Sequence, residues 1–398
     1  MFEVELGHYL TYHHVTQGFF RKHRDKFDGL IIPLSVATVF RQGTGGFVLT
    51  LKKQYALDPR TPIFQAEFDR SHIRRAHKEM ASVHGPAIEA VFGSRPLQPS
   101  DLGAAEIRDV AQRVLTFQKE FAQQSAAKVQ KYAALLGENV EAAYGGPHFL
   151  IPPYFKFGSR ADPWYRISLE VAQVAANEKT DYRLAPVIHI RPDFPEGQLD
   201  GVASDYSSPI FDGFIVFVND LQEYQADRSI LTKYVKLVLA LRQNRRPMLG
   251  LFGGYFTLVL RKIDLGCFSN AVGYGEYRDS GYHEGGQAVR RYYVPKLHRY
   301  FTDIEAQSIL DIVNEQWFRC GCGVCAGRRR IANLTTDQLL DHFLNVRKQE
   351  LEHAGRTDLR TILDELEETP GRLAGNRSIP ADRYGHLTEW VAALRPFS

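Results

Sequence analysis

Three of the four cysteines in this sequence lie within six positions, and this cluster is its most informative feature. Cys320, Cys322 and Cys325 stand as C-x-C-x-x-C in CGCGVC, where the glycines let the backbone turn so that three sulfurs can converge. A tetrahedral zinc needs a fourth ligand, and the predicted helix that follows offers His342 in LLDHFLNV, with His353 about three turns later. We prefer His342, because its apolar neighbours would turn one helix face toward the cysteine loop.

Three thiolates and an imidazole would complete the coordination of zinc. Because no open position would remain for water, the predicted Zn²⁺ is structural and holds a small appendage together. The alternatives are three reduced thiols that cluster in a core loop, and a redox role. In a cytosolic protein, a spacing this tight and rich in glycine favours the zinc site.

A folded core must position these residues, and the apolar pattern predicts a (β/α)₈ barrel. Short runs rich in β-branched and aromatic residues alternate with helical patterns, which predicts a parallel sheet with helices outside. Eight such strands would close into a barrel. The eight runs are LIIPLSV near 30, GFVLTL near 47, HFLIPPYF near 148, APVIHI near 185, GFIVFV near 213, PMLGLFG near 247, LGCFSNAV near 265 and VRRYYV near 289.

The helical stretches predict where the chain departs from a plain barrel. Helices over about 164–177, capped by Asp162, and about 229–243 fit between strands. Three regions are expected: a barrel over 1–316 with a helical insertion at about 66–147, a zinc-binding subdomain over 317–353, and a helical extension over 354–398. In the extension, the loop TPGRLAGNRSIP is expected to separate two helices, with Pro380 starting the last one.

Length, composition and charge set the class of protein. The 398 residues allow one large domain with an appendage, and 44% hydrophobic with 24% charged residues excludes disordered and fibrous chains. The net charge of +3 is too small to indicate nucleic-acid binding by itself. No apolar run approaches the ~18 residues of a membrane span, and no signal peptide is recognisable. We therefore expect a soluble cytoplasmic protein without a membrane partner.

Two stretches without any acid suggest contacts with nucleic acid. Between 285 and 302, cations interleave with aromatic residues, and between 317 and 336 arginines surround the cysteines. Cations that neutralise phosphates and aromatic rings that stack on bases are what a single-stranded or flipped nucleotide requires. The alternative is a solvated face with structural tyrosines. The candidate nucleic-acid-binding residues are Arg290, Arg291, Lys296, Arg299, Arg328, Arg329 and Arg330, with Tyr292, Tyr293, Tyr300 and Phe301 as the interleaved rings.

With CGCGVC followed by LLDHFLNV, the sequence resembles the tRNA-guanine transglycosylase superfamily. Its members are (β/α)₈ barrels that carry a zinc subdomain of the form C-x-C-x-x-C with a histidine on the next helix, and the likeness covers residues 25 to 350. Family members exchange a guanine for a 7-deazaguanine in tRNA, and distant relatives do so in DNA. The resemblance therefore implies a nucleic acid, tRNA or DNA, and a purine or 7-deazapurine base as partners, and a homodimer or heterodimer.

The resemblance also implies two catalytic acids. One carboxylate attacks the anomeric carbon of the ribose, and the other moves protons on the departing and incoming purines. Asp58 in DPRTPIFQ corresponds to the family's acid/base aspartate in D-S-G-G-F-Q, although the paired glycines are missing and the stretch is two residues longer. Its alternative role is an Asp-Pro turn.

For the nucleophile, the family segment V-D-x-F-D-C corresponds to RKIDLGCFSNAVGYGE. This stretch retains Asp264 at the first acidic position and has Cys267 where the nucleophilic aspartate stands. Asp264 is the predicted nucleophile. Two alternatives stay open: Cys267 is an ordinary buried thiol in a protein that has lost the reaction, or the correspondence is shifted by a residue or two.

Further residues are candidates for contacts with the base. GFIVFVNDLQE has the length and ends of the family's base-contacting segment, and its Asp220 and Glu223 follow a strand at the end where barrels hold active sites. Glu276 of GYGE is another acid expected at the same cleft. In IPPYFKF, Tyr154 and Phe155 replace an expected base-recognising aspartate and are predicted to stack on a base.

Three functions remain open on the sequence alone. The first is a base-exchanging pentosyltransferase that acts on tRNA or DNA. The second is a non-catalytic zinc-containing barrel that serves as a nucleic-acid-binding or partner subunit. The third is an unrelated barrel hydrolase that uses Asp220, Glu223 and His189.

Overall fold

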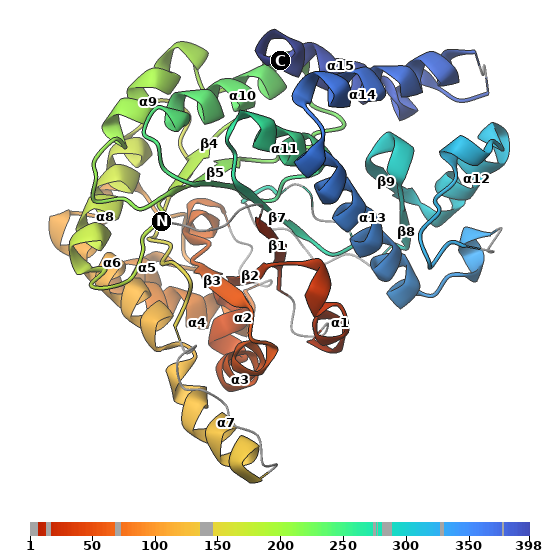
Figure 1. The fold of residues 1–398 in the computed structure, drawn as a ribbon. Coiled ribbons are helices and arrows are strands. Elements are labelled where there is room, and N and C mark those ends of the chain that lie inside the picture. Colours follow the sequence, from red (N-terminus) through yellow and green to blue (C-terminus); the bar gives the residue numbers. More distant parts are fainter. Residues whose placement is uncertain are drawn as a thin grey trace.

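The computed structural model describes residues 7–12, 17–67, 73–135, 146–273, 276, 278–280, 289–326, 330–375 and 378–398, with the backbone alone for 132–135. Seven parallel strands form one curled sheet with the order β3-β2-β1-β7-β6-β5-β4 (Figure 1). The strands are β1 (Gly7–Thr11), β2 (Gly29–Pro33), β3 (Gln54–Asp58), β4 (Val187–Ile190), β5 (Phe214–Val218), β6 (Met248–Gly250) and β7 (Cys267–Ala271).

An extended segment, residues 148–157, closes the gap between the edge strands β3 and β4. On one side, the His148 N–H donates to the carbonyl oxygen of Tyr55 in β3 at 2.7 Å. On the other side, Leu150 and Phe157 form parallel bridges with Leu184 and with Ile190 of β4. The segment therefore takes the eighth place, and the predicted (β/α)₈ barrel is confirmed as a TIM-like fold.

Two of the eight predicted strands were assigned wrongly. GFVLTL lies in the helix α3 (Arg41–Leu51), where Gly45 packs so tightly that a Cβ added to it would lie 2.7 Å from Ser125 Oγ. VRRYYV forms a strand of a separate antiparallel pair outside the barrel. Their places are taken by β1 and β3, whose short runs HYLT and QYALD are polar enough to escape a search for apolar strands. A short apolar run does not distinguish a strand from a buried helix, which explains the error in α3.

Helices cover the outside of the barrel (Figure 1). The helix predicted over 164–177 is α8, and the Asp162 side chain accepts from the Trp164 N–H at 3.0 Å as the predicted cap. The helix predicted over 229–243 is α10. The helices up to this point are α1 (Gln17–Lys22), α2 (Leu34–Val39), α3 (Arg41–Leu51), α4 (Arg75–His84), α5 (Pro86–Val91), α6 (Ala104–Glu120), α7 (Gln123–Leu135), α8 (Pro163–Glu178), α9 (Leu199–Asp205), α10 (Arg228–Arg242) and α11 (Tyr255–Val259).

The C-terminal part packs beside the barrel, with α13 between the barrel strands and the β8–β9 pair (Figure 1). The predicted loop TPGRLAGNRSIP is wrong in its first half, because α14 continues through Pro370 to Ala374. Pro380 precedes a short 3₁₀ helix, and α15 begins only at Gly385. The elements are β8 (Arg291–Val294), β9 (Arg299–Thr302), α12 (Asp303–Val313), α13 (Thr336–Arg356), α14 (Leu359–Ala374) and α15 (Gly385–Leu394).

Side chains fill the barrel interior. Alternate residues of each strand point inward. The interior becomes more polar toward the carboxyl ends of the strands, where Asp58 and His189 lie. The apolar interior residues are Tyr9, Ile31, Ala56, Phe149, Ile151, Tyr154, Ala185, Val187, Ile215, Phe217, Leu249, Leu251, Phe252 and Cys267. Among the described residues, no helix combines the length and the apolar character needed to cross a membrane.

Candidate metal centre and barrel mouth

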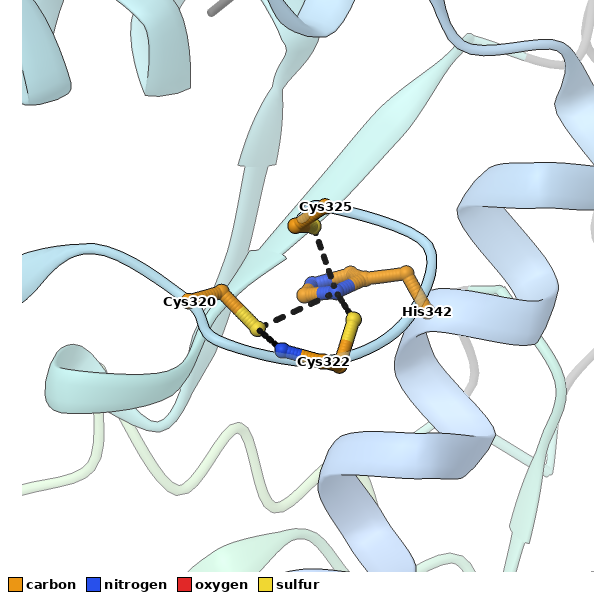
Figure 2. Close-up of side chains that lie close together, drawn as sticks. All are labelled: Cys320, Cys322, Cys325 and His342. Atoms are coloured by element: carbon orange, nitrogen blue, oxygen red, sulfur yellow. Dashed lines mark hydrogen bonds between the residues drawn. The ribbon is translucent and has the colours of Figure 1, made fainter. Parts of the chain in front are cut away.

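The four predicted zinc ligands converge on one point (Figure 2). The His342 Nδ1 atom lies 3.6 Å from Cys320 Sγ, 3.4 Å from Cys322 Sγ and 3.3 Å from Cys325 Sγ, and all four ligand atoms lie within 4.8 Å of one another. Tetrahedral zinc with Zn–S near 2.3 Å and Zn–N near 2.0 Å would separate sulfur from nitrogen by about 3.5 Å. The Cys₃His group therefore has the size of a metal site.

Neighbouring groups orient the ligands. His342 donates from Nε2 to the carbonyl oxygen of Tyr293 at 2.7 Å, which selects the neutral tautomer whose Nδ1 lone pair is available to a metal. The Tyr292 ring stacks on the imidazole at 4.2 Å, and its hydroxyl lies 3.3 Å from Cys325 Sγ. The Cys322 N–H donates to Cys320 Sγ at 3.4 Å. These contacts support thiolate sulfurs and a fixed imidazole.

Local structure explains why these residues meet. The cysteines lie in a loop closed by the Cys325 N–H, which donates to the carbonyl oxygen of Cys322 at 2.9 Å. His342 is fully buried on α13, and that helix starts with a capping box formed by Thr335 and Gln338. His353, the other histidine on α13, contacts Glu365 at 2.6 Å instead.

A second polar group lies at the carboxyl ends of the barrel strands. We call this end the mouth, and its residues are Asp58, Arg60, Tyr154, Lys156, His189, Asn219 and Asp279. Barrel enzymes hold their active sites at this end because the loops that follow the strands converge there. The mouth is therefore the second candidate site.

Asp58 ends β3 and is buried in the mouth. The Tyr154 hydroxyl donates to Asp58 Oδ1 at 2.8 Å, and the Arg60 N–H donates to the same oxygen at 3.0 Å. Burial raises the pKa of Asp58, while the Arg60 guanidinium and the Tyr154 hydroxyl oppose that rise. The Asp-Pro turn, which was the alternative role of Asp58, is present as well, since Asp58 accepts from the N–H of Arg60 two residues later.

His189 and Asn219 connect Asp58's side of the mouth to a second carboxylate. The His189 ring contacts Tyr154 edge-on at 5.8 Å and stacks on Phe217 at 4.1 Å. Burial lowers the pKa of His189 to about 3, so its imidazole is neutral at physiological pH. Its Nε2 lies 3.3 Å from Asn219 Oδ1, and Asn219 Nδ2 donates to Asp279 Oδ1 at 3.1 Å.

Asp279 also faces a cation from the segment that closes the barrel. Lys156 Nζ lies 3.8 Å from Asp279 Oδ1. The backbone of Lys156 is held by the Gln65 side chain, which accepts from its N–H at 2.8 Å and donates to its carbonyl oxygen at 3.0 Å. Gln65 ends the DPRTPIFQ stretch, so the same stretch supplies Asp58 and fixes Lys156. The mouth thus holds a deeply buried carboxyl group and a half-buried carboxylate beside a cation.

The predicted nucleophile, Asp264, lies at the wrong end of the barrel. It precedes Cys267, the first residue of β7, whereas Asp58 stands beyond the level of Ala271, the last residue of that strand. At ~3.3 Å per residue, the two carboxylates are about 20 Å or more apart along the strands. Asp264 is 58% exposed and pairs with Arg242 at 2.5 Å. One ribose cannot reach both acids.

Cys267 is also remote from the mouth. It lies at the amino end of β7 in the apolar interior, where burial raises the pKa of its thiol to about 11. The thiol is therefore neutral and surrounded by apolar groups. This agrees with the alternative that Cys267 is an ordinary buried residue.

Glu223 and Glu276 do not contact the mouth as predicted. Both oxygens of Glu223 are used at the start of α11, where they accept from the N–H groups of Gly254, Phe256 and Thr257 at 2.7, 2.8 and 3.1 Å. The Glu276 carboxylate pairs with Arg347 of α13, whose guanidinium opposes the rise in the pKa of Glu276 that burial causes.

Of the remaining base-contact candidates, two lie in the mouth region. Tyr154 points into the barrel but is buried and bonded to Asp58, so its ring does not offer an open face. Asp220 is exposed directly after β5, and its N–H donates to the carbonyl oxygen of Arg278 at 2.8 Å. Phe155 points to the other side and stacks on Trp164 of α8 at 4.6 Å, which excludes stacking on a base.

Only some of the residues predicted to contact nucleic acid are exposed. The interleaved rings of Tyr292, Tyr293, Tyr300 and Phe301 are buried and cannot stack on bases. Arg299 lies over the rings of Tyr224 and Phe301, each at 4.5 Å, and donates to the carbonyl oxygen of Asp382, so it is structural. Arg291 is half-buried, Arg290, Lys296 and Arg330 are exposed, and Arg328 and Arg329 lie outside the described residues.

Three residues of the mouth were missed as site residues in the sequence: Arg60, Lys156 and Asp279. Arg60 follows Asp58 so closely that the Asp58 motif could have indicated it. Lys156 stands in IPPYFKF, two residues after Tyr154 on the same side of an extended segment. For Asp279 no local signal exists, because only the folded loop brings it beside Asn219.

Comparisons with known proteins add little to this geometry. Neither the family models nor the curated proteins include a match to this chain. Among solved structures, the intracellular xylanase TsXylA of Thermoanaerobacterium saccharolyticum JW/SL-YS485 is similar at a TM-score of 0.36 and 8% identity in a mutant with xylotriose, covering 70% of this chain and 87% of that one. A second TsXylA structure has a TM-score of 0.36 and 6% sequence identity, and the match covers 72% of this chain and 91% of that one. A TM-score this low supports no conclusion about activity.

Proposed function

We propose that this protein is a base-exchanging pentosyltransferase that replaces a guanine by a 7-deazaguanine in tRNA or DNA, with the mouth as its active site. The observation that carries the proposal is the position of Asp58 at the carboxyl end of a barrel strand. Its carboxyl group is buried, has a raised pKa and accepts a hydrogen bond from Tyr154. Glycosyl transfer uses one carboxyl group as a proton donor and a second, ionised one as a nucleophile or base.

Asp279 replaces Asp264 as the second carboxylate in this proposal. Asn219 donates to the Asp279 carboxyl group and Lys156 lies 3.8 Å from the same oxygen, and the carboxylate is the form that would attack carbon. An oxygen of Asp279 would bond to the ribose anomeric carbon as the bond to guanine breaks, and Asp58 would give its proton to the departing base. The incoming base would then return its proton to Asp58 and displace Asp279, so both carboxyl groups regain their starting states.

The Cys₃His group fits Zn²⁺ by its donor set and dimensions. Cys320, Cys322, Cys325 and His342 would hold the ion with no open position, so the metal would supply fold stability and no chemistry. Lys296 and Arg330 are the exposed candidates for contacts with phosphates, whereas Arg290 pairs with Asp303 at 3.5 Å and donates to the carbonyl oxygen of Leu334. A cytoplasmic location and a homodimer or heterodimer belong to the same proposal through the family resemblance.

A non-catalytic nucleic-acid-binding or partner subunit is the second candidate. The position of Asp264 favours it, because the nucleophile expected from the family motif is absent from the mouth. The barrel hydrolase built on Asp220, Glu223 and His189 loses its support, since both oxygens of Glu223 are taken by α11.

Release of labelled guanine from tRNA and from DNA in a single turnover tests the proposal. The wild-type protein should release guanine from one of them, and the rate should fall as pH rises through the raised pKa of Asp58, because the donor must be protonated. The Tyr154 hydroxyl stabilises the ionised form of Asp58. Tyr154→Phe should therefore raise that pKa and move the falling limb of the pH–rate profile to higher pH by about one unit.

Tyr165→Phe is the matched control, because Tyr165 also donates its hydroxyl to an aspartate, Asp205, but does so on α8. Tyr165→Phe should leave the falling limb of the pH–rate profile in place. No release from either nucleic acid at any pH would favour the non-catalytic subunit. A limb that stays unmoved in Tyr154→Phe would remove Asp58 as the proton donor.

A further inference from the structure

The loop after β7 is fastened to the helix that carries His342. Gly273 has a φ of +101°, and a Cβ there would lie 2.9 Å from Leu340 of α13. Glu276, further along the loop, pairs with Arg347 of the same helix. Two points of the loop therefore rest on α13, about two turns apart.

Arg347 is the centre of this fastening. Its side chain has no exposed surface, and it pairs with Glu276 and, at 3.0 Å, with Glu350. Aromatic rings enclose the guanidinium, with Tyr293 and Phe343 each at 5.2 Å and Phe268 of β7 at 5.8 Å. A buried cation shared by two carboxylates in this setting fixes the geometry of its partners, because any displacement would leave a charge buried and unpaired.

The metal centre and this ion cluster share a strand. The carbonyl oxygen of Tyr293 in β8 accepts from His342, and the hydroxyl of the same tyrosine donates to Glu350 at 2.9 Å. His342 and Arg347 thus hold one rigid helix against β8 from two adjacent turns. A change at the Cys₃His group would move or loosen the helix to which Glu276 is bound.

Glu276 lies three residues before Asp279 in the sequence. The same part of the loop is anchored on its other side, since the carbonyl oxygen of Arg278 accepts from the Asp220 N–H and the Ser280 N–H donates to Asn219 Oδ1 at 2.9 Å. Asp279 is therefore placed between the ion cluster on α13 and the end of β5.

We propose that Arg347 is a positioning residue that couples the Cys₃His centre to the mouth: through Glu276 it fixes the loop that presents Asp279. This inference rests on the proposed function for its catalytic consequence, but the coupling itself is a property of the fold. The metal centre would then tune the order of the mouth in addition to holding the C-terminal part together.

Hydrogen exchange of the zinc-loaded protein of 398 residues tests the coupling. Arg347→Met would leave two carboxylates buried without a cation and could prevent folding, so Glu276→Gln is the primary variant. It should raise the exchange rates of the amides at 276–280 about tenfold or more, while one zinc per chain and the slow exchange of α13 are retained. Glu352→Gln, an exposed acid on α13, is the matched control and should change nothing.

Chelation of zinc from the wild-type protein should raise exchange at 276–280 together with exchange around His342. The coupling is refuted if Glu276→Gln leaves 276–280 as in the wild type, if it raises exchange uniformly over the chain, or if chelation loosens α13 but not the loop. In guanine release, Glu276→Gln should lower kcat with KM little changed. A wild-type protein without any guanine release would refute the proposed function. The exchange data would still decide whether the Cys₃His centre is coupled to the mouth.

Discussion

Cys322→Ser should remove the metal from the protein and unfold its C-terminal part. A serine hydroxyl is a poor zinc ligand, so zinc should fall from about one ion per chain to below about 0.1. Because metal binding and folding are coupled at structural sites, the loss of folding free energy should be on the order of 5 kcal/mol. Metal analysis of the purified protein and the thermal unfolding midpoint measure both effects.

Cys267→Ser provides the matched control, since it makes the same change in a buried cysteine outside the cluster. It should retain one zinc per chain and lose only the stability expected from a polar group in an apolar interior, about 1–3 kcal/mol. If Cys322→Ser and Cys267→Ser behaved alike, the cysteine cluster would be a group of thiols without a metal.

Asp58→Asn should lower the rate of guanine release about 10³-fold. The amide keeps the size of the side chain and can still accept from Tyr154, but it cannot donate a proton to the departing base. General acid–base catalysis accounts for about 10²–10⁴ in rate. Single-turnover release at the pH optimum measures the effect, and zinc content should remain at one per chain.

The geometry also predicts which aspartate is dispensable. Asp264→Asn makes the same chemical change at the amino end of the barrel, where it breaks only a half-exposed ion pair with Arg242. Its release rate should stay within about twofold of the wild type, because such pairs contribute ~1 kcal/mol or less to stability. A large loss in Asp264→Asn with none in Asp58→Asn would place the reaction at the opposite end of the barrel.

Local spacing in the sequence was enough to find the Cys₃His group. The three cysteines lie within one loop, and the apolar neighbours of His342 determine which face of α13 turns toward them. His342 is preferable to His353 for the same reason. Neither inference requires knowledge of how distant parts of the chain meet.

The sequence predicted the barrel fold correctly, but not every segment that forms one of its strands. An alternation of strands and helices leads to a parallel barrel, yet GFVLTL became α3 because periodicity does not separate a short buried helix from a buried strand. β3 was overlooked because QYALD contains polar residues that belong to its exposed start and to the mouth.

The site at the mouth depended on strand ends and long-range contacts, which the sequence does not specify. Asp264 was assigned by its motif, but the strand begins only at Cys267, which puts Asp264 at the opposite end. Glu223 was assigned by its place after β5, yet its partners are backbone N–H groups of α11 about thirty residues later. Asp279 was missed because its partners, Asn219 and Lys156, come from two other parts of the barrel.

The most direct measurement is to identify the residue that becomes attached to the nucleic acid. Wild-type protein would be quenched in denaturant during guanine release, before a new base is supplied, and the cross-linked peptide would be located by mass spectrometry. The account predicts a ribose attached to Asp279, which is lost in Asp279→Asn and retained in Asp264→Asn. Attachment to Asp264 or Cys267, or guanine release without any attachment, would contradict it.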